Sequence, residues 1–324
     1  MQLATHVAAL ILFAQAAHGG PPALVWPLDC EQGKTCYIED YVDSDRGPDK
    51  TDFTCGLKTR DGHRGTDIVL QDFAMMDRGV DILAAAPGTV AATRDGVEDL
   101  AVTAATREVT KGRECGNAVR IDHGDGWQTL YCHMRQGSVT VRSGDQVAAG
   151  DTLGLVGLSG LTNIPHLHIS VLKDGKVVDP FQPNPPSGAT CGAVGDTLWA
   201  TLPAHNRAGL FTAGMTTQVP DFADIKSGAA RADTTRPDQP LVLYGHVFYA
   251  ESGDMLTLTT IGPQGVIFSK QILLKDPKKQ LFRAYGRKAP PNGWPTGTYR
   301  GVVRLERKGT LIAWRHADIT VTSQ

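Results

Sequence analysis

The 324-residue sequence lacks the features that mark several large classes of protein. Its formal net charge is only −2 and it contains no basic block, so nucleic acid is not an expected partner. No apolar run reaches the ~18 residues that a transmembrane helix requires, so no membrane span is expected. Helical periodicity is scarce, and its longest candidate is a turn or two within residues 70–86. Plentiful Gly, Pro, Val, Thr and Ile instead predict an all-β chain of short strands and frequent turns.

Two common metal and redox motifs are also missing. No C-x-x-C occurs, which argues against a cysteine-rich zinc site and a thioredoxin-like redox motif. No H-E-x-x-H occurs either, so that motif supplies no glutamate base. If the chain hydrolyses a bond at a metal, another group near the metal must transfer the proton.

The first 20 residues are expected to be a secretory signal peptide. Residues 7–13 form a short apolar core, and the A-Q-A-A stretch that follows suits a cleavage site. Residues 1–6 contain no Lys or Arg, which is atypical of a signal and leaves an apolar first helix as the alternative. The expected localisation is periplasmic or secreted.

The cysteine content fits an oxidising compartment. An even number of cysteines in an exported chain suggests disulfides, although the count leaves many pairings open. Cys115 and Cys132 flank a predicted hairpin and are the preferred pair. Cys30 with Cys36 would close a small loop and leave Cys55 for Cys191, two pairings that the sequence does not decide.

The clearest hairpin signal covers residues 117–133. Alternating apolar residues lead into Asp125-Gly126, a favoured turn dipeptide, and a second alternating run leads back. The hairpin would bring Cys115, Cys132 and His133 to one end.

Composition divides the chain into further segments. Residues 21–60 are polar and turn-rich, and are expected to be a disulfide-rich segment packed on the following domain, 61–181. Residues 182–235 are expected to hold a proline-rich linker and uncertain strands near 198–202 and 210–219. Residues 236–324 show the rhythm of an immunoglobulin-like β-sandwich.

Two short fragments about a hundred residues apart carry the chemistry. N-I-P-H-L-H-I-S-V places His166 and His168 two apart in a strand-like run, so both imidazoles lie on one face. D-G-H-R-G-T-D supplies His63 and Asp67. For either fragment alone, a surface or core histidine is the commoner explanation. Together with Tyr131-Cys132-His133, they predict one metal site.

Six motifs then follow one another in a specific order. They are G-H-R-G-T-D (62–67), A-P-G-T-V (86–90), G-N-A-V-R-I-D-H-G-D-G-W (116–127), Y-C-H-M (131–134), S-G-D-Q-V-A-A-G (143–150) and P-H-L-H (165–168). This order resembles the lysostaphin-type zinc metallopeptidases over roughly residues 60–181. The resemblance implies a catalytic antiparallel β-sheet of barrel-sandwich-hybrid type, followed here by the β-sandwich outside the resemblance.

The resemblance also implies roles for individual residues. His63, Asp67 and His168 would bind one Zn²⁺, and His166 and His133 would be the catalytic histidines. The implied activity is hydrolysis of peptide cross-links in bacterial peptidoglycan, with peptide stems as the partner.

Several alternatives and details remain open at this point. The alternatives are a non-catalytic regulator of wall hydrolases and a zinc peptidase acting on proteins. The complete ligand set favours the enzyme. The C-terminal sandwich could bind the wall, a protein partner or the catalytic groove. His123 is expected to have a structural role, and His205, His246 and His316 to be ordinary surface or core residues. Cys132 departs from the small residue that many relatives carry before the catalytic histidine.

Overall fold

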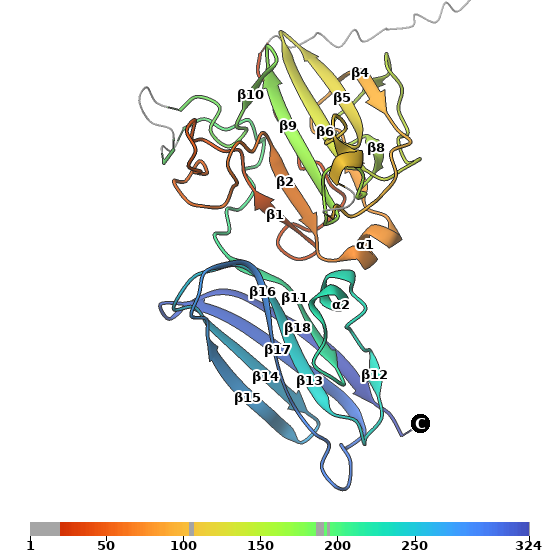
Figure 1. Ribbon diagram of the computed structural model, residues 1–324, viewed down its shortest axis with the longest axis vertical. Helices are drawn as coiled ribbons and strands as arrows, with labels where there is room; N and C mark the ends of the chain where they lie inside the picture. Colours follow the sequence, from red (N-terminus) through yellow and green to blue (C-terminus); the bar gives the residue numbers. More distant parts are fainter. Residues whose placement is uncertain (1–19, 104–106, 186–190, 193–194, 324) are drawn as a thin grey trace, which may run out of the picture.

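The chain forms two β-rich lobes (Figure 1). The computed structural model describes residues 20–103, 107–185, 191–192 and 195–323. The expected signal peptide, apart from Gly20, lies outside the described residues. Almost all neighbouring strands are antiparallel, and β12 with β18 is the parallel pair among the named strands of the described part. The predicted all-β class is confirmed.

The N-terminal lobe contains the segment that carries the six motifs. Its elements are β1 (Cys36–Asp40), β2 (Thr66–Leu70), α1 (Phe73–Arg78), β3 (Asp81–Leu83), β4 (Gly88–Arg94), η1 (Arg107–Thr110), β5 (Asn117–Gly124), β6 (Trp127–Met134), β7 (Gln146–Val147), β8 (Thr152–Leu155), β9 (His166–Lys173) and β10 (Lys176–Val178). The main sheet has the order β1-β2-β9-β6-β5-β4-β7, with β10 paired to β9, and β3 pairs with β8 in a separate sheet. The short helix α1 lies where helical periodicity predicted a turn or two.

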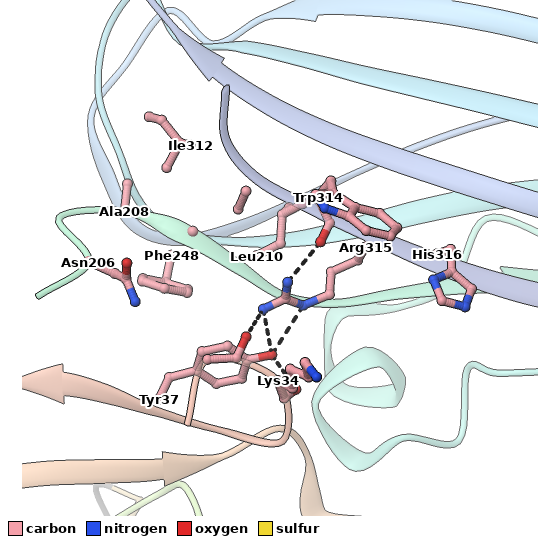
Figure 2. A pocket seen from close by; sticks show the side chains of 13 residues that line it. Lys34, Tyr37, Asn206, Ala208, Leu210, Phe248, Ile312, Trp314, Arg315 and His316 are labelled. Carbon is pink, nitrogen blue, oxygen red and sulfur yellow. Dashed lines mark hydrogen bonds between the residues drawn. The ribbon is translucent and has the colours of Figure 1, made fainter. Parts of the chain in front are cut away.

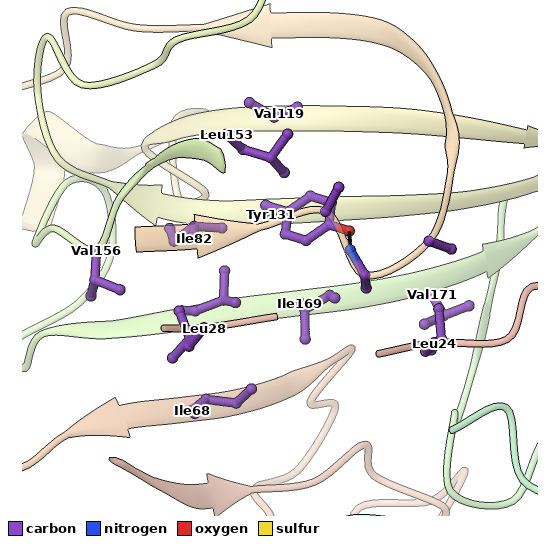
Figure 3. Packing of buried hydrophobic residues seen from close by; sticks show 14 of the residues in the cluster. Leu24, Leu28, Ile68, Ile82, Val119, Tyr131, Leu153, Val156, Ile169 and Val171 are labelled. Carbon is purple, nitrogen blue, oxygen red and sulfur yellow. Dashed lines mark hydrogen bonds between the residues drawn. The ribbon is translucent and has the colours of Figure 1, made fainter. Parts of the chain in front are cut away.

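One face of the main sheet packs into the core of this lobe. Alternate residues of β2, β6 and β9 supply Ile68, Tyr131 and Ile169, which are at most 1% exposed (Figure 3). The hydroxyl of Tyr131 accepts a hydrogen bond from Ala85 N at 2.7 Å, so this buried polar atom is paired. Because side chains alternate across a strand, the intervening residues lie on the opposite face, where the histidines are found.

The β5–β6 hairpin has the predicted position and turn. Gly124 pairs with Trp127 across Asp125 and Gly126, whose φ angles are 48° and 76°. Positive φ at both central positions is the geometry that favours an Asp-Gly pair. The hairpin brings Cys115 to Cys132, and this disulfide is formed, as are Cys30–Cys36 and Cys55–Cys191. The preferred pairing, Cys115–Cys132, is confirmed, and the two disulfides that the sequence left undecided are Cys30–Cys36 and Cys55–Cys191.

The segment 21–60 is more than a disulfide-stapled loop. It contributes β1, which pairs antiparallel with β2 at the edge of the main sheet and has every residue buried. The five residues C-Y-I-E-D show no apolar alternation, because both faces of the strand are covered. Sequence periodicity therefore did not reveal this strand.

The C-terminal lobe consists of a three-stranded and a five-stranded sheet. Its elements are β11 (Gly209–Thr216), α2 (Phe222–Ser227), β12 (Thr234–Thr235), β13 (Leu241–Ala250), β14 (Met255–Gly262), β15 (Gly265–Leu273), β16 (Lys278–Arg287), β17 (Gly297–Arg307) and β18 (Thr310–Val321). The sheets have the orders β11-β13-β16 and β12-β18-β17-β14-β15 and share one apolar core.

This lobe takes in strands from the expected linker region. β11 matches the uncertain strand near 210–219 and pairs with β13 along its length, so the sandwich begins well before residue 236. The other expected strand, near 198–202, is replaced by a single bridge between Leu24 and Trp199. Because β11 is buried on both faces, its sequence lacks the apolar alternation that would have identified it as a strand of the sandwich.

The two lobes are in direct contact. Tyr37 of β1 packs against Phe211 and Phe248 of the sandwich, and its hydroxyl donates to Phe211 O at 2.9 Å. Arg315 of β18 donates to the same hydroxyl at 3.0 Å (Figure 2). The contact also includes Val69 of β2, which lies on the sheet face that carries the histidines. The sandwich thus adjoins the candidate site.

Candidate metal centre

Strand pairing brings the two histidine-bearing fragments together. β2 and β9 are antiparallel neighbours, with Asp67 opposite His168 and Val69 opposite His166. Directly opposite residues project from the same face of a sheet, so Asp67 and His168 meet there. Gly65 allows the His168 ring to approach, because a Cβ at this position would lie 2.6 Å from that ring.

Three side-chain atoms converge at this point. Asp67 Oδ1 lies 2.7 Å from His168 Nδ1 and 3.1 Å from His63 Nε2, and the two nitrogens are 3.2 Å apart. All three residues are largely buried, with His168 the most accessible. The set predicted from the sequence is therefore assembled in space.

The hydrogen bonds that His63 and His168 form with residues outside this cluster determine which ring nitrogens carry protons. His63 Nδ1 lies 2.6 Å from the carbonyl oxygen of Tyr41, which can only accept, so Nδ1 is the donor. Ser170 Oγ donates to Arg64 O at 2.7 Å, so it accepts from His168 Nε2 at 3.0 Å. When both rings are neutral, His63 Nε2 and His168 Nδ1 carry no proton, and their lone pairs point towards one another.

This donor set fits a divalent metal ion. Two imidazole lone pairs and a carboxylate oxygen repel one another unless a cation lies between them. Zn–N and Zn–O bonds of about 2.0–2.2 Å in a tetrahedron put ligand atoms about 3.3 Å apart, close to the separations found here. Among the described residues, these three form the group of His, Cys, Asp and Glu side chains able to hold such an ion.

Asp67 is ionised in this environment. Burial opposes its charge, but the neighbouring histidines lower the pKa of its carboxyl well below the usual value. Its second oxygen, Oδ2, accepts from Arg60 at 2.5 Å. Arg60 therefore occupies Oδ2 and leaves Oδ1 directed at His63 and His168.

His166 and His133 stand side by side next to this group. Their ring centroids are 4.5 Å apart, and His166 Nε2 lies 3.6 Å from Asp67 Oδ1. His166 Nδ1 donates to Ile164 O at 3.0 Å, and His133 Nδ1 donates to Ser159 O at 2.8 Å. Burial lowers the pKa of both imidazoles, that of His133 strongly. Each ring is therefore neutral at neutral pH, with Nε2 free to accept a proton.

The position of His133 depends on an irregular strand end. Its φ of 62° lies in the left-handed region, which is unusual for a non-glycine residue and marks local strain. The preceding Cys132 is bonded to Cys115, whose carbonyl oxygen accepts from His133 N at 2.8 Å. The covalent link and the hydrogen bond hold the strained residue on both sides.

The remaining histidines of the described residues lie outside this group. His123 bridges Pro87 O and Thr129 Oγ1 at 2.8 and 2.9 Å, in agreement with a structural role. His205 packs against Tyr41 and Phe53, and His246 is buried between Phe211 and Phe222. His316 stacks on the half-exposed Trp314.

Sequence reasoning missed the groups that support the ligands. Ser170 follows His168 by two positions on the same face of β9, so strand periodicity could have indicated it. Arg60 precedes the G-H-R-G-T-D motif and gave no signal. Asp40, which also contacts Arg60, lies in the strand that was not predicted.

His63, Asp67 and His168 converge at one point beside an antiparallel β-sheet, and two further imidazoles lie next to them. This arrangement is typical of metal-dependent hydrolases. The sequence model of peptidase family M23 matches residues 62–180, which contain all five residues. The match to peptidase family M23 thus covers this domain and not the rest of the chain.

Curated relatives match part of the chain. The chain is 39% identical over 72 residues to the cell division protein DipM of Caulobacter vibrioides, a match covering 22% of this chain and 12% of DipM. It is 33% identical over 75 residues to the peptidoglycan DD-endopeptidase ShyA of Vibrio cholerae, covering 23% of this chain and 17% of ShyA. It is 35% identical over 104 residues to the DD-carboxypeptidase/endopeptidase Mpg of Neisseria meningitidis, covering 32% and 21%. The chain thus spans less than a quarter of the length of these relatives.

A solved structure also resembles part of the chain. The catalytic domain of the prophage-encoded M23 protein EnpA from Enterococcus faecalis, in a mutant form, is 25% identical. The match has a TM-score of 0.30 and covers 44% of this chain and 85% of that one.

Proposed function

We propose that this protein is a zinc metalloendopeptidase that hydrolyses peptide cross-links of bacterial peptidoglycan. The observation that carries the proposal is the convergence of His63 Nε2, Asp67 Oδ1 and His168 Nδ1, whose hydrogen-bond partners leave lone pairs for a metal. His63, Asp67 and His168 would hold the ion. Bound zinc would polarise the scissile carbonyl and lower the pKa of water.

His166 and His133 carry the proton transfers in this proposal. Both rings are neutral, both expose a bare Nε2, and no carboxylate other than Asp67 pairs with them in the described part of the chain. His166 lies nearer Asp67 Oδ1 and is assigned as the general base, which takes a proton from the attacking water. His133 is assigned as its partner: the proton taken from the water would be returned through this imidazole pair to the nitrogen of the leaving amine.

The substrate and localisation follow from the relatives' names and from the cysteines. ShyA and Mpg are named as endopeptidases, and ShyA as one of peptidoglycan. Three disulfides suit an oxidising periplasm or exterior, where cell-wall peptides are found. No helix in the described residues is long and apolar enough to cross a membrane. We infer a periplasmic or secreted enzyme whose partners are peptide stems.

Digestion of purified sacculi tests this proposal. Wild-type protein, the same protein with a chelator, and His168→Ala would be compared, and new amine and carboxyl ends identified by mass spectrometry. The proposal expects new peptide ends from the wild type alone. Zinc binding without any release from sacculi would instead favour a protein substrate or a regulator of other hydrolases.

A further inference from the structure

The metal-site carboxylate has a second carboxylate as its strand neighbour. Asp40 of β1 lies opposite Asp67 of β2, and the two are 0% and 2% exposed. Like charges directly opposite each other destabilise a sheet, and burial makes the repulsion stronger. Arg60 Nη1 lies between them, 2.6 Å from Asp40 Oδ2 and 2.5 Å from Asp67 Oδ2. One guanidinium therefore serves two buried carboxylates.

The C-terminal sandwich supplies the other groups that contact Asp40. Lys279 Nζ of β16 lies 2.8 Å from Asp40 Oδ2, and the hydroxyl of Tyr249 of β13 donates to Asp40 Oδ1. β13 and β16 pair Phe248 with Gln280 and Ala250 with Lys278, so Tyr249 and Lys279 are opposite each other. Tyr249 has a φ of 49°, a strained conformation at the point where the strand pair reaches Asp40.

The Arg and Lys side chains that form ion pairs with Asp40 and Asp67 come from both lobes. Asp40 and Asp67 bring two negative charges, Arg60 brings one positive charge, and Lys279 brings the second. In the absence of Lys279, Arg60 would be the remaining Arg or Lys side chain within ion-pair distance of Asp40 among the described residues. The guanidinium would then be drawn towards Asp40 and would hold Asp67 Oδ2 less firmly.

We propose that the sandwich is part of the metal centre: Lys279 and Tyr249 are positioning residues that act through Asp40 and Arg60 on Asp67. By neutralising Asp40, they leave Arg60 free to hold Asp67 Oδ2 and to direct Oδ1 at the metal. This inference rests on the metal site of the proposed function, and it assigns the sandwich a role independent of wall or partner binding.

A simple docking role is the competing explanation. Lys279 also lies 3.7 Å from Glu39, and Gln280 donates to Glu39 at 2.6 Å, so this corner joins the lobes in any case. The two explanations predict different effects of removing the Asp40 carboxylate. If Lys279 acts by neutralising Asp40, removing the Asp40 charge restores the metal site without Lys279. If Lys279 only fastens the lobes, removing Asp40 as well loosens them further.

The inference is tested by measuring the zinc affinity of the full chain in competition with a chromophoric chelator. Lys279→Met should weaken zinc binding ~10-fold, within the range for groups that support metal ligands. Lys279→Arg should keep wild-type affinity. The matched control is Lys278→Met, because Lys278 is exposed and, among the described residues, the Lys side chain that forms an ion pair with Asp40 is Lys279. The double variant Asp40→Asn with Lys279→Met should regain most of the lost affinity.

The outcomes separate this inference from the proposed function. If the wild type fails to bind zinc, the metal site of the proposed function is wrong. A wild type that binds zinc and a Lys279→Met variant of equal affinity would overturn the role of the sandwich. A weakened Lys279→Met that the second substitution does not restore would also overturn it, in favour of docking. Thermal unfolding of each variant verifies that both lobes remain folded.

Discussion

His166 and His168 approach the same oxygen of Asp67 from successive outward positions of β9. His168 Nδ1 lies 2.7 Å from Oδ1, and His166 Nε2 lies 3.6 Å from it. The rings differ in which nitrogen they present. The hydrogen bond to Ser170 places the ring proton of His168 on Nε2, whereas the hydrogen bond to Ile164 O places that of His166 on Nδ1. Two residues that look equivalent in P-H-L-H therefore offer different atoms to the site.

This difference predicts that the two histidines are separable by substitution. His168→Ala removes a proposed ligand and should abolish tight zinc binding. His166→Ala should keep zinc bound and lower kcat ~100- to 10,000-fold, the usual contribution of a general base. Bound zinc would be measured by metal analysis after gel filtration, and kcat on a cross-linked wall peptide. A His166→Ala enzyme that cleaves at the normal rate would show the role assignment to be wrong.

Ser170 should matter for zinc affinity although it does not contact the metal. Its hydroxyl accepts from His168 Nε2 and donates to Arg64 O, which fixes the His168 tautomer. Ser170→Ala leaves a buried N–H without a partner, and loss of such supporting groups typically weakens metal binding ~10- to 100-fold. Chelator competition measures the change. Ser269→Ala in the sandwich, where the hydroxyl is exposed, is the control and should bind zinc like the wild type.

Part of the candidate site was predictable because the positions of some of its residues follow from local pattern. His166 and His168 share a face through the period of a strand, and the turn Asp125-Gly126 determines the hairpin that delivers His133. The disulfide Cys115–Cys132 followed from the same hairpin. The meeting of His63 and Asp67 with β9 required the family resemblance, since strand spacing alone does not say which strands are neighbours.

The supporting groups were not predictable for a physical reason. Arg60, Asp40 and Lys279 come from three separate segments, and their contact depends on how β1 pairs and how the lobes dock. β1 and β11 are buried on both faces, so neither shows the alternation that identifies a half-exposed strand. The alternation of apolar and polar residues identifies strands with one solvent-exposed face. It gives little signal for strands that are buried on both faces at an interface.

The Cys115–Cys132 disulfide should affect turnover more than zinc binding. It holds the strand end where His133 has a φ of 62°, while His63, Asp67 and His168 lie on other segments. Replacing both cysteines with serine should lower stability by about 3 kcal/mol, as the loop-closure relation gives for a separation of 17 residues. It should also lower kcat while zinc affinity stays near wild type. The matched control replaces Cys30 and Cys36; unchanged kcat in the Cys115/Cys132 variant would count against the positioning role.

His246 should make the sandwich sensitive to acid. It is 3% exposed between Phe211 and Phe222, and burial lowers the pKa of its imidazole to about 4. Because the ring is harder to protonate when folded than when unfolded, protons favour the unfolded chain. Stability from this residue is complete above about pH 6.5 and is lost progressively as pH falls towards 4.

A His246→Leu variant isolates this contribution, since leucine fills much of the same space and does not titrate. The wild type should lose on the order of 3 kcal/mol more than the variant between pH 7 and pH 4. Urea unfolding at a series of pH values, with a chelator present in every sample, gives the two profiles. Other histidines, including His133 and His166, titrate equally in both proteins, so their effects cancel in the difference. Parallel profiles would mean that His246 is solvated or paired when the protein is folded, contrary to its buried position.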